Sequence, residues 1–270
     1  MSVTSNEPRV DMRTAAAGIS DEEWALRCDL AAAYQLIDLY GYSDLAGTHI
    51  SVRVPGPEHH FLLNPLGVLF DQITASSLIK VDQHGQVVGG DNKDLNLAGF
   101  VIHSAIHMAR PDLVCALHTH TRANNAVGAT VEGLLPLTQK ALLILPFVAY
   151  HDYEGAATDL DERERIVDDL GKDGRALILR NHGALTVGAS IAEAWVWNYR
   201  LEMACRFQVD ALSCVAGGLT PNHLRQETID HTMAQGKAFL SPGGWFAAGT
   251  VEWPSLLVKL EQERGTAYRS

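Results

Sequence analysis

Short strand-type segments alternate with longer helix-type segments along most of the chain, and no other feature restricts the fold as strongly. THISVRVP (48–55), with alternating and β-branched residues, and FLLNP (61–65) flank the turn GPEHH and predict a β-hairpin. LIKVD (78–82) and VV (87–88) predict a second hairpin around QHG. Further strands are predicted within 113–120, 141–150 and 176–188, the last of which holds two strands joined by a tight turn.

Helical segments separate these strands. Ser20 and Glu23 form a capping box before WALRCDLAAAYQLIDLY, which predicts a helix that stops at Gly41. Further helices are predicted over 95–112, 159–171 and 190–212. Because the connections are mostly short and several strand pairs are hairpins, we expect a mixed sheet flanked by helices in a single α/β domain.

The length of 270 residues suits one large domain with a substantial core. We expect a flexible leader over 1–19, the main domain over 20–215, and a C-terminal helical tail over 216–270. This tail is expected to pack on the domain or on a neighbouring subunit. The chain has 32 acidic and 21 basic residues, which gives a net charge of −11. This charge repels polyphosphates and argues against a nucleic-acid partner.

Cysteine usage and hydropathy favour a cytoplasmic protein. The cysteines are far apart and form no C-x-x-C pair, which is typical of free thiols in a reducing compartment. The N-terminus has no apolar core of a secretory signal. The most apolar run, 141–150, is interrupted by Pro146 and is too short to cross a bilayer. We therefore expect no membrane association.

Two histidines one residue apart follow the apolar run LVCAL. On a strand, residues i and i+2 share a face, so His118 and His120 are expected to project the same way. Imidazole is a ligand for zinc, iron, copper and nickel. A third ligand could come from the pair His103 and His107, four residues apart on a predicted helix, or from His182 in the turn RNHG, where Gly183 permits a tight bend. The residues alone leave both sources open.

Three segments together resemble the class II aldolase and adducin family: AGTHISVRVPG with FLLNPLG, HSAIHMARPDLVCALHTHT, and LRNHGALTVGASIAEAW. They occur in the family's order and spacing over about residues 20–215. The resemblance implies an α/β/α sandwich around a mixed, mainly antiparallel sheet. It also implies a small-molecule substrate and a homotetramer with sites at subunit interfaces.

The resemblance further implies a metal-binding site with one divalent ion per subunit, typically zinc. By position in the motifs, the ligands are His118, His120 and His182. His103 and His107 then become pocket residues behind the ligands.

The sequence departs from the family's sugar-phosphate aldolases, in which a glutamate acts as acid and base and two serines help hold phosphate. Gly99 takes the place of that glutamate, and Leu97 and Ala98 take the places of the serines. A glycine cannot accept a proton, and apolar side chains cannot satisfy phosphate oxygens. Leu66 replaces a polar residue of the phosphate loop, and His49 stands near the family's asparagine. These departures argue against ordinary retro-aldol cleavage of a sugar phosphate.

Three functions follow from these observations. The first is a metal-dependent lyase that cleaves a C–C bond of a 2-oxo or 2-hydroxy acid, because three neutral ligands leave the full charge of the ion to polarise a bidentate substrate. The second is a non-haem Fe(II) oxygenase, resembling family members that carry out oxidative decarboxylation of a prenylated 4-hydroxyphenylpyruvate to a benzoate. The third is a non-catalytic adducin-like interaction module. The metal is zinc or iron in the first two.

Other polar residues are candidates for roles around the ion. Tyr153 and Glu154 in YHDYEG, with His103 and His107 behind them, are candidates for proton transfer. Arg180 and His49 are candidates for substrate binding, although an arginine in such a position more often pairs with a nearby acid.

Overall fold

The computed structural model describes residues 19–90, 94–95, 97–155, 161–246 and 249–270; nearly all of the predicted leader lies outside them. The described strands are β1 (His49–Arg53), β2 (Phe61–Leu63), β3 (Ile79–Val81), β4 (Val87–Gly89), β5 (Cys115–Thr119), β6 (Val148–His151), β7 (Ala176–Leu179) and β8 (Gly183–Gly188). They form one sheet in the order β4-β3-β2-β1-β5-β8-β7-β6. Each neighbouring pair is antiparallel except β6 and β7, which are parallel.

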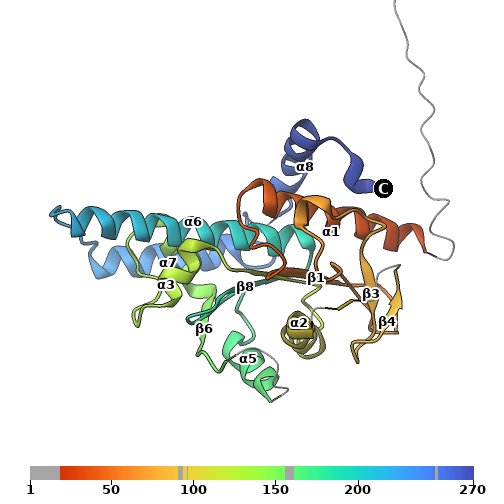
Figure 1. The fold of residues 1–270 in the computed structure, drawn as a ribbon. Coiled ribbons are helices and arrows are strands. Elements are labelled where there is room, and N and C mark those ends of the chain that lie inside the picture. Colours follow the sequence, from red (N-terminus) through yellow and green to blue (C-terminus); the bar gives the residue numbers. More distant parts are fainter. Residues whose placement is uncertain (1–18, 91–93, 96, 156–160, 247–248) are drawn as a thin grey trace, which may run out of the picture.

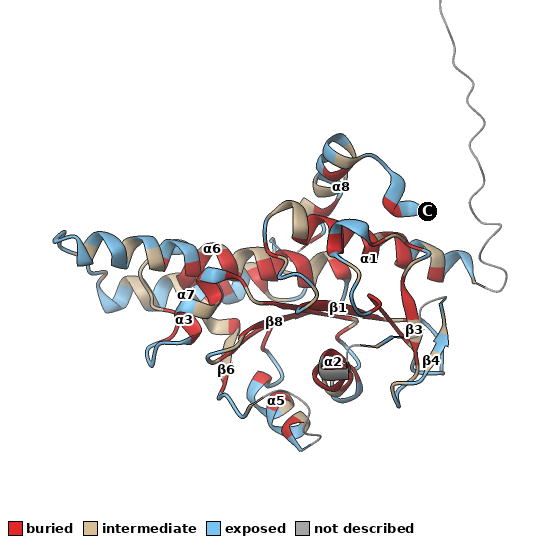
Figure 2. Ribbon diagram, viewed as in Figure 1, coloured by how far each residue is buried: buried red, intermediate tan, exposed pale blue. Residues whose placement is uncertain are grey.

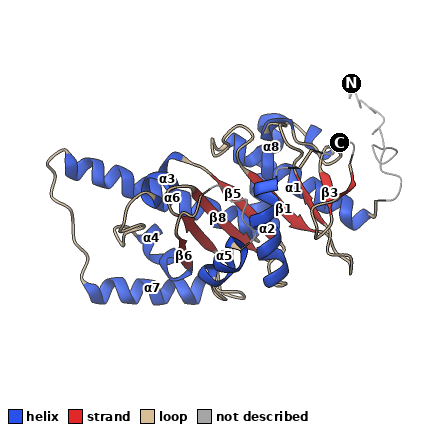
Figure 3. Ribbon diagram, turned by 60° about the horizontal axis from the view of Figure 1, so that its bottom comes forward, coloured by secondary structure: helices blue, strands red, loops and turns tan. Residues whose placement is uncertain are grey.

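Helices cover both faces of this sheet (Figure 1). α1 (Asp21–Leu39) and α6 (Ile191–Ala216) lie on one face, and α2 (Leu97–Ala109) and α5 (Glu162–Leu170) lie on the other. α8 (Glu252–Arg264) packs against α1 from outside. Figure 3 shows the strands lying among these helices from a second direction. The prediction of an α/β/α sandwich around a mixed, mainly antiparallel sheet is confirmed.

Buried residues concentrate in the sheet and on the helix faces that contact it (Figure 2). The core on the α1 and α6 side includes Trp195 and Trp197, which expose 1% and 0% of their surface. A second core lies on the α2 and α5 side. Leu117 of β5 belongs to the first core and Ala116 to the second. Because β5 is packed between the two cores, its backbone cannot shift easily, and the residues at its C-terminal end are held in position.

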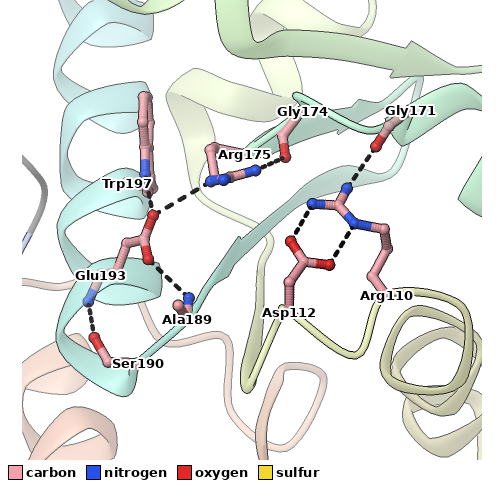
Figure 4. Close-up of polar contacts among 9 residues, drawn as sticks. All are labelled: Arg110, Asp112, Gly171, Gly174, Arg175, Ala189, Ser190, Glu193 and Trp197. Carbon is pink, nitrogen blue, oxygen red and sulfur yellow. Dashed lines mark hydrogen bonds and ion pairs between the residues drawn. The ribbon is translucent and has the colours of Figure 1, made fainter. Parts of the chain in front are cut away.

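The start of α6 is tied to the strands beside it (Figure 4). The Ser190 side chain accepts a hydrogen bond from the Glu193 backbone, as the capping motif predicts. The Glu193 carboxylate accepts further hydrogen bonds from the Ala189 N–H (2.7 Å), the Arg175 guanidinium (3.3 Å) and the Trp197 indole (3.4 Å). The Ser190 side chain thus satisfies one of the free N–H groups at the helix start, and the Glu193 carboxylate joins α6 to Ala189 after β8 and to Arg175 before β7.

One strand prediction is wrong in part. Within 141–150, only β6 is a strand; the preceding residues form α4 (Gln139–Ile144) and a short 3₁₀ turn. The Thr138 side chain caps this helix by accepting from the Ala141 N–H. Pro146 has no N–H to donate to a sheet and instead occupies the first turn of the 3₁₀ segment. Apolar composition alone did not distinguish these two structures.

The C-terminal segment is helical and lies against the rest of the chain. α7 (Gln226–Leu240) packs against α4, and α8 packs against α1. The cysteines are all free; Cys214 is exposed and the other three are buried. In the described part of the chain, no helix combines the length and apolar character needed to span a membrane.

Candidate metal centre

His118 lies in the central strand β5, and His120 follows directly after its end. β5 is hydrogen-bonded to β1 on one side and to β8 on the other, so His118 exposes only 1% of its surface. The Thr119 hydroxyl between the two histidines donates to the Asn198 side chain of α6 at 2.9 Å. The rings of His118 and His120 converge, with centroids 4.5 Å apart.

The turn between β7 and β8 brings His182 to the same place. Asn181 adopts a left-handed conformation (φ 58°), which asparagine tolerates better than most residues, and the His182 N–H donates to the Leu179 carbonyl at 3.1 Å. Gly183 then starts β8. A Cβ at this position would lie 2.6 Å from the Thr119 carbonyl oxygen and 2.8 Å from Cδ2 of His120. Glycine is therefore needed at position 183 because β8 lies close to the end of β5 there, whereas the sharp bend of the turn is made at Asn181.

One ring nitrogen from each of His118, His120 and His182 lies within 4.8 Å of the others. Nitrogens bound to one zinc at 2.0–2.1 Å are roughly 3.4 Å apart in a tetrahedral site, so small ring rotations bring these to coordinating distance. Burial, reinforced by neighbouring histidines, holds the pKa of His118 well below its usual range and lowers the pKa of His182 to about 4. Both rings are therefore neutral at pH 7, as metal ligation requires.

The hydrogen bonds of the first two rings determine where their protons lie. Nδ1 of His118 is 3.0 Å from the Ala184 carbonyl oxygen, which can only accept, so this nitrogen carries the proton. Nδ1 of His120 is 3.0 Å from the Asp44 carboxylate and donates to it in the same way. When both rings are neutral, their Nε2 atoms carry only lone pairs, yet the two atoms lie 2.7 Å apart. Two lone pairs at this distance repel, and a cation bound by both nitrogens removes the repulsion.

Asp44 therefore orients one of the candidate ligands. We expect Asp44→Asn to weaken binding of a divalent ion by about 10-fold, at the lower end of the range for residues that support metal ligands, since this carboxylate is half-exposed. Titration of the protein with Zn²⁺ in competition with a chromophoric chelator measures this. Asp71→Asn, at an exposed position on a 3₁₀ turn, is the matched control and should bind like the wild type. Equal affinities for both variants would contradict the role of Asp44.

A row of buried polar side chains extends from the triad toward α2. The His49 ring lies 5.1 Å from that of His118 and 4.3 Å from that of His103. The Ser51 hydroxyl is 2.7 Å from Nδ1 of His103 and 2.7 Å from Nε2 of His107. His103 and His107 thus face the sheet and share a serine, and they do not join the triad. Burial, followed by the effects of His120 and His182, lowers the pKa of His49 to about 3, against a small opposing effect of the Gly99 backbone.

The remaining predicted residues lie at the rim. Tyr153 is 57% exposed and lines a small cavity that His182 also borders. The carboxylate of Glu154 is hydrogen-bonded to Arg165, which lowers its pKa against a small effect of burial. Arg180 lies 3.3 Å from Asp152 and donates to a backbone carbonyl, so it is already paired with an acid. Nothing is described of the side chains of Leu97 and Ala98, whereas Leu66 is 46% exposed.

Sequence reasoning missed the acidic partners of two histidines. Asp44 precedes His120 by 76 residues, so no local pattern could connect them. His151, which lines the same small cavity as His182, is held between Asp169 at 2.7 Å and Glu162 at 3.4 Å. The acidic composition of the helix predicted over 159–171 is the only sequence signal for the second case, and it does not point to a histidine partner.

The chain is similar to known proteins over most of its length. The family described as Class II Aldolase and Adducin N-terminal domain matches residues 28–209. A Caulobacter vibrioides protein named "Putative aldolase class 2 protein" is 48% identical over 91% of this chain and 92% of its own length. The structure of L-fuculose 1-phosphate aldolase from Glaciozyma antarctica PI12 is 30% identical, with a TM-score of 0.77 over 92% of this chain and 93% of that chain. Alpha-adducin of Rattus norvegicus is 42% identical over 88% of this chain, which corresponds to 33% of that protein.

Proposed function

Since the chain belongs to the class II aldolase and adducin family, we propose that it is a metal-dependent lyase acting on a small 2-oxo or 2-hydroxy acid. In this proposal His118, His120 and His182 hold one divalent ion. The observation that carries it is the 2.7 Å separation of two Nε2 atoms whose protons are fixed on the opposite side of each ring. Without a bound cation, the repulsion between these two lone pairs would destabilise the arrangement.

The donor set fits such an ion. A divalent cation bound by three neutral imidazoles keeps its full charge and would supply Lewis-acid polarisation of a substrate oxygen. The residues of this chain do the rest: the imidazoles hold the ion and Asp44 orients His120. In retro-aldol cleavage of a 4-hydroxy-2-oxo acid, the C3–C4 bond breaks and its electron pair goes to C3, giving the enolate of pyruvate. The C4 hydroxyl loses its proton and becomes the carbonyl of an aldehyde, and C3 takes up a proton to give pyruvate. We propose Tyr153 for proton transfer because it borders the cavity beside His182.

Sugar phosphates fit this site less well than small acids. Gly99 supplies no carboxylate, and Leu66 supplies no donor to a phosphate. The likeness to an L-fuculose 1-phosphate aldolase supports the type of reaction, aldol cleavage of a C–C bond, rather than that substrate. The family fold also supports self-association, and we propose a homotetramer, which native mass spectrometry would identify.

The first experiment is elemental analysis of protein purified anaerobically without added metal. We expect about one divalent ion per chain, removed by a chelator, and release of pyruvate from 4-hydroxy-2-oxo acids only by the loaded protein. Absence of a stoichiometric ion would overturn the proposal and favour a non-catalytic adducin-like role, which the likeness to alpha-adducin supports.

The same preparation separates a lyase from an oxygenase. Three imidazoles are suitable ligands for either zinc or Fe(II), so the ligand set does not distinguish the two metals. Oxygen uptake with arylpyruvates by the Fe(II)-loaded protein, without pyruvate release from hydroxy-oxo acids, would replace the lyase with the oxygenase. We expect the opposite result.

A further inference from the structure

His49 and Gly99 interlock beside the three histidines. His49 begins β1 and is 3% exposed, and its ring fills the space next to Gly99 in the first turn of α2. A Cβ on residue 99 would lie 2.5 Å from Cδ2 and 2.7 Å from Nε2 of this ring, far inside contact distance. An imidazole at position 49 therefore requires glycine at position 99. The two departures from the aldolase pattern are therefore sterically dependent on each other.

The interlocked ring has unused hydrogen-bonding capacity. Neither Nδ1 nor Nε2 of His49 has hydrogen-bond geometry to a partner among the described residues. The Gly99 backbone acts on the ring, but it can serve one nitrogen at most. Buried imidazoles in native proteins normally have partners for both nitrogens. The ring lies beside the triad, with its centroid 5.1 Å from that of His118.

The charges around the triad indicate what that ligand is. Among the acidic side chains described nearby, Asp152 and Glu154 are paired with Arg180 and Arg165. Asp44 accepts a hydrogen bond from His120, and Glu162 lies 3.4 Å from His151. A neutral ring at position 49 adds no negative charge, in contrast to a glutamate at position 99. A loaded site would therefore be more positive than one that contains a carboxylate base, and it would attract an anion more strongly than a neutral hydroxyketone.

We propose that His49, accommodated by Gly99, is the specificity-determining residue of this site and donates a hydrogen bond to a carboxylate oxygen of the substrate. This deepens the proposed function and rests on it. His49 selects carboxylates over neutral carbonyl compounds, and Gly99 has a steric role that allows the ring to be there.

The binding experiment uses full-length protein loaded with Co²⁺, with oxalate as the anionic probe and dihydroxyacetone as the neutral one, both measured by calorimetry. We expect His49→Ala to weaken oxalate binding by about 10-fold to 100-fold, the factor for one hydrogen bond to a charged group, with little change in Co²⁺ or dihydroxyacetone affinity. His49→Asn, which keeps a polar side chain, covers the case in which alanine disturbs the fold. His60→Ala, a half-buried histidine in the β1–β2 connection, should bind both probes like the wild type.

A double-mutant cycle tests the interlock without any metal. We expect Gly99→Ala to lower the Tm by several degrees, because the new Cβ overlaps the His49 ring. The double variant His49→Ala/Gly99→Ala should recover most of this loss, since the overlap is gone. Additive effects of the two substitutions would overturn the interlock.

The outcomes separate this proposal from the one on which it rests. A wild type that binds no Co²⁺ would overturn the proposed function and the role of His49 with it. A wild type that binds Co²⁺ and oxalate, with unchanged oxalate affinity in both His49 variants, would overturn the role of His49 alone.

Discussion

Replacing His182 with alanine is expected to abolish stoichiometric binding of a divalent ion while the chain stays folded. A four-ligand zinc site binds with about 10–16 kcal/mol, so each ligand contributes about 3 kcal/mol, or about 100-fold in affinity. His182 lies in a turn and is half-buried, so its loss removes a ligand without opening the main core. Elemental analysis and chelator competition measure the ion, and circular dichroism measures the fold.

The matched control is His60→Ala, since His60 is also half-buried but lies in the connection between β1 and β2. This variant should keep one ion per chain. If His182→Ala also kept its ion with wild-type affinity, the ligand assignment would be wrong. The next group to examine would then be His49 and His103, whose rings lie beside His118.

Gly183→Val is expected to damage both the fold and the metal centre. The added Cβ would lie 2.6 Å from the Thr119 carbonyl oxygen, 2.8 Å from Cδ2 of His120 and 3.2 Å from Cε1 of His118. β5 and β8 are hydrogen-bonded neighbours and cannot separate without breaking their ladder. Overpacking of this kind destabilises a protein by about 1–3 kcal/mol. The same displacement moves two candidate ligands, so we also expect ion affinity to fall at least about 10-fold, as it does when groups supporting metal ligands are lost.

Chemical denaturation and chelator competition measure these two effects. Gly89→Val in the edge strand β4 is the matched control, because a Cβ there would meet the Lys80 side chain at an ordinary 3.4 Å. That variant should be as stable as the wild type and bind the ion equally well. Wild-type stability and affinity in Gly183→Val would mean that β8 does not constrain the two histidines.

The alternation of strand and helix segments was sufficient to predict the architecture. Hairpins at β1–β2 and β3–β4 and the capped helices α1 and α6 follow from short-range physics: turn residues, alternating burial, and side chains that accept from the first free N–H groups. The exception, α4, shows the limit of that reasoning. An apolar run is compatible with either structure, and the Thr138 cap and Pro146 decided between them.

The sequence by itself also determined which residue types could hold an ion, since H-x-H spacing and a histidine in an N-H-G turn are local patterns. Only the tertiary structure decided which of them meet. Pairing of β5 with β8 brings His182 to His118 and His120, and the loop after α1 brings Asp44 to His120. The tertiary structure also shows that the His49 ring fills the space where a side chain at position 99 would lie. Contacts between residues 50 or more positions apart depend on strand order and register, and these are set by packing of the whole core rather than by any local segment.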